Sequence, residues 1–173
     1  YEPSPVRRKE TPKPDGGVRK LGIPTVVDRV IQQGIAQKLQ NIWEPLFSDS
    51  SYGYRPRRSG QQAIQKVKEY AEEGYRYAVS VDLSKYFDTL NHELLMNLLH
   101  RKIQDMRVLR IIKKYLKSGV MENGVVSKTE EGSPQGGPLS PLLANIYLNE
   151  FDWEMHSRGV KTVRYADDIV VFA

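Results

Sequence analysis

The stretch RYADDIVVFA, residues 164–173, places two adjacent carboxylates, Asp167 and Asp168, between two runs that are typical of β-strands. Residues 162–165 and 169–172 are rich in Val, Ile, Tyr and Phe, so Ala166 and the two aspartates are predicted at or near the bend of a hairpin. Like charges this close repel each other, and something must offset that cost. A solvated turn would do so, because aspartate is a favoured turn residue and water screens both charges. The alternative, which would imply a function, is that a bound divalent cation neutralises the two carboxylates.

A third aspartate interrupts another apolar strand. The segment YRYAVSVDLS, residues 75–84, is typical of a buried central strand, where an unpaired Asp82 carboxylate would be costly. One interpretation places Asp82 at the strand's end, paired with a nearby lysine or capping the next turn. In the other, two adjacent antiparallel strands bring Asp82 close to Asp167 and Asp168.

Three carboxylates in one small volume favour a magnesium site. Mg²⁺ prefers hard oxygen ligands, needs only one or two protein carboxylates, and completes its octahedron with water and phosphate oxygens. Two such ions about 3.5 to 4 Å apart form the clamp that polymerases and nucleases use for in-line displacement at phosphorus. Asp82 and Asp167 would then bridge the two ions, and Asp168 would be a weaker or outer ligand.

The amino-acid composition excludes several kinds of functional site and favours one kind of partner. The 173 residues match the usual size of a single domain, and the absence of cysteine excludes a disulfide framework, a thiolate zinc site and a cysteine nucleophile. No apolar run approaches the roughly 20 residues that cross a bilayer, so we expect no membrane contacts. The lack of cysteine fits a reducing setting, and we expect a bacterial cytoplasmic protein. The net charge of +5 and three clusters of basic residues favour nucleic acid as a partner.

The rest of the chain alternates helical and strand patterns irregularly. The first predicted elements are a hairpin over 11–24 with a basic tip and a helix after the cap Thr25, whose apolar stripe comprises Val27, Val30, Ile31, Ile35, Leu39 and Ile42. They are followed by a helix from Ser59 to Gly74, a helix after Asn91, a helix over 105–119, a hairpin around Asn123-Gly124 and a helix capped by Ser140. Since no strand-helix-strand period repeats, we predict an α+β fold with antiparallel strands.

Five blocks of the sequence resemble the first five conserved blocks of reverse transcriptases in order and spacing. The blocks are PKPDGGVRKLGIPTVVDRVIQQ (12–33), SYGYRPRRS (51–59), VDLSKYFD (81–88), GSPQGGPLSPLLANIYL (132–148) and YADD (165–168). The sequence is most similar to bacterial group II intron-encoded reverse transcriptases, also called maturases. The resemblance covers essentially the whole chain.

The resemblance implies the fingers and part of the palm of a right-hand polymerase. The fingers would comprise residues 1 to about 75 and parts of 90–160, and antiparallel palm strands packed with helices would lie at 76–89 and 160–173. The thumb and later palm blocks would lie beyond Ala173. We therefore expect weak or no processive synthesis by this fragment alone.

The resemblance also assigns roles around the incoming nucleotide. Asp82, Asp167 and Asp168 match the catalytic metal ligands, with two Mg²⁺ ions that Mn²⁺ can replace. Lys13 and Arg19 resemble finger residues that grip a triphosphate, although an ordinary basic hairpin has the same pattern. Phe87 matches the aromatic residue that screens the sugar and Gln135 a residue beside the nucleotide. Periodicity alone would instead pack Phe87 in the core with Tyr86 nearer the site, and Gln135 would serve equally well as a loop amide.

Arg55, Arg57 and Arg58 and the basic helix over 101–117 are loosely assigned to the template or primer backbone. The expected partners are an RNA template, a DNA primer, a deoxynucleoside triphosphate (dNTP) and group II intron RNA, and an apolar patch left by a missing thumb would favour a homodimer. The alternatives are an RNA-binding maturase module and a retron, diversity-generating or CRISPR-associated reverse transcriptase. His92, His100 and His156 lack metal-ligand spacing and are interpreted as structural.

Overall fold

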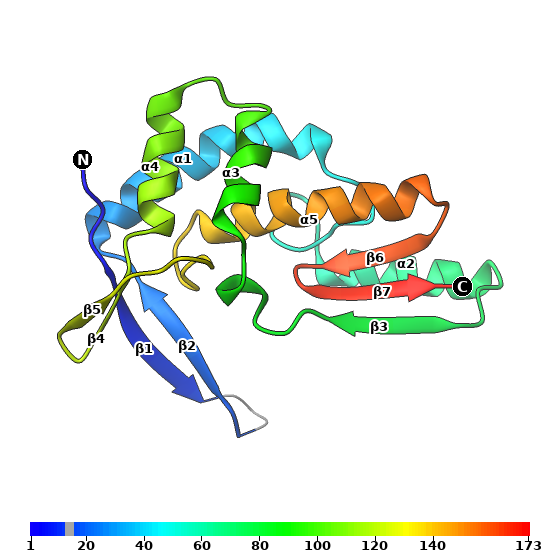
Figure 1. The fold of residues 1–173 in the computed structure, drawn as a ribbon. Coiled ribbons are helices and arrows are strands. Elements are labelled where there is room, and N and C mark those ends of the chain that lie inside the picture. Colours follow the sequence, from blue (N-terminus) through cyan, green and yellow to red (C-terminus); the bar gives the residue numbers. More distant parts are fainter. Residues whose placement is uncertain (13–15) are drawn as a thin grey trace. The chain divides into compact units, whose positions relative to one another are not determined.

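The computed structural model describes residues 1–12 and 16–173 and confirms an α+β fold (Figure 1). Lys13 therefore lies outside the described residues. The elements are β1 (Val6–Pro12), β2 (Val18–Ile23), α1 (Val26–Trp43), the 3-10 helix η1 (Glu44–Leu46), α2 (Gly60–Glu72), β3 (Ala78–Asp82), the 3-10 helix η2 (Tyr86–Asp88), α3 (His92–His100), α4 (Met106–Leu116), β4 (Val120–Glu122), β5 (Val125–Ser127), α5 (Ser140–Ser157), β6 (Lys161–Tyr165) and β7 (Asp168–Phe172). None of the helices described is long and apolar enough to cross a membrane.

Local sequence signals account for the starts of helices α1 and α3. The Thr25 hydroxyl accepts a hydrogen bond from the Asp28 amide at 3.2 Å, and the Asn91 side chain accepts one from the Leu94 amide at 2.9 Å. Each satisfies an amide that the first helical turn leaves without an intrahelical partner. Ser140 is an exception, because α5 already begins at this residue and its hydroxyl donates to the Pro134 carbonyl at 2.8 Å.

The chain divides into two compact units. The first comprises residues 1–40 and 85–143 and contains a sheet with strand order β2-β1-β4-β5. The β1–β2 hairpin is antiparallel, whereas β1 pairs with β4 in parallel through Val6 and Arg7. Helices α3 and α4 pack on each other, and the Leu95, Leu99 and Ile112 side chains are fully buried.

The second unit comprises residues 41–84 and 144–173 and contains an antiparallel sheet with strand order β3-β7-β6 (Figure 1). Helix α2 packs against β6. A core forms around Tyr52, Ala63, Val163 and Phe172. This sheet carries Asp82 and Asp168, and its β6–β7 turn carries Asp167.

The prediction that residues 75–84 form a buried central strand is wrong. Among the described residues β3 pairs with β7 alone, so it lies at the edge of its sheet, and every residue from Ala78 to Asp82 is exposed. An apolar run of this length shows that a strand forms but does not specify which neighbours cover it.

Candidate active site

Asp82 and Asp168 lie directly opposite each other on neighbouring strands. They are register partners in the antiparallel pair β3–β7, so their side chains project from the same face of the sheet. Residues in such positions have Cβ atoms about 4.5 to 5.5 Å apart. Strands that are remote in sequence therefore place two carboxylates side by side, as the metal-site hypothesis requires.

Asp167 occupies the bend next to this pair. Tyr165 pairs with Asp168, which leaves Ala166 and Asp167 as the two loop residues of the β6–β7 hairpin. Ala166 has a φ of 58°, and a positive φ at the first loop residue is the conformation of a type II′ turn. The register thus confirms the predicted hairpin, in which Asp167 is the last loop residue and Asp168 is the first residue of β7.

The three carboxylates are available to a ligand. Asp82 and Asp168 are exposed and Asp167 is half-buried. No salt bridge between described residues uses any of them, so the alternative in which a lysine neutralises Asp82 has no support in this part of the chain. Among the described residues, no group of three or more His, Cys, Asp or Glu side chains is arranged to hold a metal ion. The pair of hard oxygen donors still suits Mg²⁺, which needs only one or two protein carboxylates.

A buried arginine that the sequence analysis did not single out holds this turn. Arg164 has no exposed side-chain surface, and its Nη1 donates to the Ala166 carbonyl at 2.9 Å and to Asn145 Oδ1 at 3.0 Å. Nε and Nη2 bind both carboxylate oxygens of the equally buried Asp152, and Nη2 also donates to Ser51 Oγ. The guanidinium therefore ties the turn to α5. A charged residue inside the strand pattern TVRY was the available signal.

Gly53 supports the same turn from the other side. Its carbonyl accepts a hydrogen bond from Asn145 Nδ2 at 2.8 Å, and a Cβ at this position would lie 2.3 Å from the backbone nitrogen of Ala166. Contacts that short do not occur without movement of the backbone. Only glycine allows the segment to approach the hairpin this closely.

We therefore expect Gly53→Ala to displace the turn and to lower the free energy of unfolding by about 1 to 3 kcal/mol. Urea denaturation measures the loss. Gly34→Ala is the matched control, since an added Cβ there meets no atom within 4 Å and Gly34 lies inside α1. That control should be neutral or stabilising because alanine favours helices. Equal stability of the two variants would contradict the close approach.

The predicted nucleotide-binding residues Phe87, Gln135 and Arg19 lie in the first unit. Phe87 is half-buried in η2, and its carbonyl accepts a hydrogen bond from the Ser133 amide at 2.6 Å. Lys85, with a φ of 53°, provides the turn after β3 that the sugar-gate hypothesis requires. Tyr86, rather than Phe87, is the buried ring of the pair. This burial disfavours the alternative that packs Phe87 in the core.

A backbone hydrogen bond connects the segments on which Gln135 and Arg19 lie. The Gln135 carbonyl accepts a hydrogen bond from the Gly22 amide in β2 at 2.7 Å, and Arg19 is exposed on the same strand. Gln135 lines a cavity of about 210 Å³ together with Arg8 and Lys20, two cations that the sequence analysis did not place at a site. Asp88 and Glu131 also line this cavity, so its lining carries two cations and two carboxylates.

The three arginines of the YRPRRS block differ in their surroundings. Arg55 is buried and binds the Glu44 carboxylate and the carbonyls of Ser48 and Ser51, which indicates a structural role. Arg58 pairs with Asp49. Arg57 is exposed, with a φ of 60°. Of the three, Arg57 has the most accessible guanidinium for a nucleic acid.

Comparison with known proteins gives consistent results. Residues 11–173 match the family described as reverse transcriptase (RNA-dependent DNA polymerase). The chain is 46% identical over 154 residues to the group II intron-encoded protein LtrA of Lactococcus lactis subsp. cremoris, covering 88% of this chain and 25% of LtrA. It is 44% identical over 162 residues to protein YkfC of Escherichia coli, covering 91% of this chain and 42% of that protein. The chain thus spans less than half the length of these relatives.

Solved structures show the same fold. A chain of a partial Cas6-RT-Cas1–Cas2 complex matches with a TM-score of 0.61 and 27% identity over 100% of this chain and 30% of that one. Telomerase from Candida albicans, solved with a fragment of telomeric RNA, matches with a TM-score of 0.72 over 100% of this chain and 38% of the telomerase chain. Its 13% identity supports a shared fold and nothing beyond the fold.

Proposed function

The chain belongs to the reverse transcriptase family, and on that premise we propose that it forms the fingers and part of the palm of a group II intron-encoded RNA-directed DNA polymerase. The observation that carries the proposal is the register pairing of Asp82 with Asp168 beside the Asp167 turn. Such a protein would act in the bacterial cytoplasm on an RNA template, a DNA primer and a dNTP during intron retrohoming.

Asp82 and Asp167 would hold two Mg²⁺ ions, or Mn²⁺ in their place, and Asp168 would act as an outer ligand. The bound ions would stabilise the attacking and leaving oxygens of the nucleotidyl transfer. The chain itself would hold the carboxylates in place before the metal ions and the substrate bind. The hydrogen bonds from Arg164 to the Ala166 carbonyl and to Asp152 would hold the turn in this conformation before the substrate arrives.

The first unit would bind the incoming nucleotide. Arg19 on β2, with Lys13 in the segment outside the described residues, would offset the charge of the triphosphate. Gln135 would contact the nucleotide from the loop that bonds to Gly22, and Phe87 would lie against the sugar. The hydrogen bond from Ser133 to Phe87 supports this grouping, because it joins the gate residue to the loop that carries Gln135.

A second candidate function is binding of the intron RNA to assist its splicing. The observation that favours it is the exposed basic surface of α4, formed by Arg107, Arg110 and Lys113 and continued by Lys117 directly after the helix. Phosphate contacts by such side chains position a nucleic acid without reading its sequence. Arg57 would extend the same kind of contact to the template or primer backbone.

The proposed polymerase function is tested by extension of a DNA primer on an RNA template by the full-length parent protein. We expect product only in the presence of Mg²⁺ or Mn²⁺ and all four dNTPs. A parent protein that folds and binds primer and template but makes no RNA-templated DNA would contradict the proposal.

Phe87→Ala in the parent protein should raise incorporation of ribonucleotides relative to deoxynucleotides by about ten- to a hundredfold, because removal of the ring opens space for a 2′-hydroxyl. Single-nucleotide extension with each sugar measures the ratio of kcat/KM values. Phe87→Tyr keeps the ring and should keep the selectivity. An unchanged ratio in Phe87→Ala would remove Phe87 from the sugar site.

A further inference from the structure

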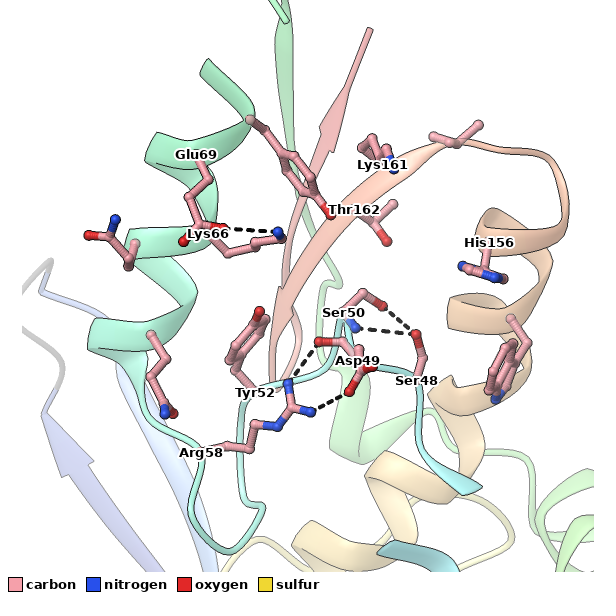
Figure 2. A pocket seen from close by; sticks show the side chains of 15 residues that line it. Ser48, Asp49, Ser50, Tyr52, Arg58, Lys66, Glu69, His156, Lys161 and Thr162 are labelled. Carbon is pink, nitrogen blue, oxygen red and sulfur yellow. Dashed lines mark hydrogen bonds and ion pairs between the residues drawn. The ribbon is translucent and has the colours of Figure 1, made fainter. Parts of the chain in front are cut away.

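The second unit contains a cavity of about 640 Å³ that the proposed polymerase site does not use. Figure 2 shows its walls, which are helix α2, the segment around Ser48 and Asp49, the end of α5 and the start of β6. Lys161 and Thr162 line it from β6. In β6 the residue that pairs with Asp168 is Tyr165. Tyr165 lies four residues after Lys161, which corresponds to roughly 13 Å along an extended strand. The cavity is therefore separate from the aspartate pair.

Positive charge exceeds negative charge in this cavity. Its cations are Lys66, Lys161 and Arg58, and its carboxylates are Asp49 and Glu69. Arg58 pairs with Asp49, and Lys66 donates to Glu69 at 2.9 Å, a hydrogen bond that raises the pKa of Lys66 and keeps it charged. Lys161 has no carboxylate partner among the described residues. The cavity is thus left with one ammonium group that an anion can neutralise.

Aromatic side chains lie beside these cations. The Lys66 and Lys161 ammonium groups lie 4.8 and 5.8 Å from the centroid of the Tyr70 ring. Burial raises the pKa of the Tyr70 phenol, so the ring is neutral at physiological pH. Trp153 lines the same cavity with 47% of its surface exposed, and its indole Nε1 donates to the Leu46 carbonyl at 3.0 Å. That bond fixes the orientation of a large flat surface.

Polar side chains complete the lining. His156 packs edge-on to Trp153, with ring centroids 5.3 Å apart at 84°, and Figure 2 shows His156 on α5 across the cavity from Lys66. Gln62 and Gln65 line the α2 wall and are exposed. Amides of this kind pair with the edges of nucleobases, and aromatic rings stack on their faces. A ligand that used the whole cavity would carry a flat heteroaromatic ring and an anionic group.

We propose that this cavity binds a nucleotide, with the base against Trp153 and the phosphate beside Lys161 and His156. A free nucleotide and a single residue of an unpaired RNA strand present the same base and phosphate. The proposal does not depend on the polymerase function, because none of the three aspartates lines the cavity.

Titration of Trp153 fluorescence tests the proposal. The chain has two tryptophans, and Trp43 is only 4% exposed, so quenching by a ligand reports on Trp153. The probes are AMP, adenosine, inorganic phosphate and a 12-residue oligoadenylate, all in EDTA so that binding at the aspartates through metal is suppressed. We expect saturable quenching by AMP or by the oligonucleotide, and weaker binding of adenosine and of phosphate alone.

Lys161→Glu should weaken the binding by about tenfold or more, because it replaces attraction to the phosphate by repulsion. Lys68→Glu is the matched control, since Lys68 is exposed on α2 but does not line the cavity, and it should change affinity less than threefold. His156→Ala provides a second test in which no negative charge is introduced. Circular dichroism checks that each variant is folded.

The possible results separate the two sources of the nucleotide. Saturable binding of AMP identifies a free nucleotide, whereas binding of the oligonucleotide alone identifies an RNA strand, and either result supports the site if Lys161→Glu weakens it. Three results would overturn the proposal: no quenching by either probe, inorganic phosphate binding as tightly as AMP, or equal losses in Lys161→Glu and Lys68→Glu. Failure of this proposal would not count against the proposed polymerase function, because primer extension by the parent protein tests that function separately.

Discussion

Replacement of Arg164 by alanine is expected to lower the free energy of unfolding by about 3 to 5 kcal/mol. The Arg164 and Asp152 side chains are both 0% exposed, and the substitution would leave the Asp152 carboxylate buried without its partner. The same change frees the Ala166 carbonyl, which Arg164 holds at 2.9 Å. Urea denaturation of the chain measures the loss through the transition midpoint at constant slope.

Two controls separate burial from charge. Arg158→Ala breaks an exposed pair with Glu154 in α5, and such pairs contribute about 0.5 kcal/mol or less. The double substitution Arg164→Met, Asp152→Leu removes both charges together and should recover much of the stability. A loss below about 1 kcal/mol in Arg164→Ala would show that the buried pair does not hold the hairpin.

Replacement of Asp82 or Asp167 by asparagine in the full-length parent protein is expected to reduce primer extension by about 10³-fold or more. Asparagine keeps the shape of aspartate but removes the charge that would hold Mg²⁺. Asp168→Asn should cost less, since Asp168 is proposed as an outer ligand. Single-turnover extension under saturating dNTP measures the chemical step without the contribution of binding.

RNA affinity distinguishes a metal role from a folding defect. Binding of the intron RNA should persist in the Asp82 and Asp167 variants, because the exposed cations of α4 that would contact phosphate are unchanged. Glu72→Gln, an exposed acid-to-amide change at the end of α2, should leave both activities unaltered. Mg²⁺-dependent extension that survives in Asp167→Asn would refute the assigned role of that carboxylate.

Local sequence signals predicted the elements that depend on local chemistry. Asn123 and Gly124 both adopt a positive φ, at 51° and 82°, as a type I′ hairpin requires. Gly74, predicted as a helix stop, follows α2 with a φ of 102°. Each of these conformations is decided by the steric freedom or hydrogen-bonding capacity of one or two residues, so no distant part of the chain is needed to predict it.

Burial was predicted less well than secondary structure. The helix at residues 26–43 was correct, but its assigned apolar stripe included Val27 and Val30, which are 60% and 68% exposed. Asp28 and Gln32 lie on the buried side of the same helix. Hydrophobicity alone cannot choose a face when polar residues there find hydrogen-bond partners, as the Asp28 carboxylate does by accepting hydrogen bonds from the Thr25 and Tyr1 hydroxyls.

For the candidate active site, the order of residues along the chain was enough to indicate two strands with aspartates at their ends and a bend between Tyr165 and Asp168. The pairing of Asp82 with Asp168, the exposed edge position of β3 and the buried Arg164–Asp152 pair all depend on contacts between segments far apart in sequence. Turns and caps follow from short-range sterics and hydrogen bonds. Register, edge position and the neutralisation of a buried charge arise only when separate segments compete for the same partners in the folded chain.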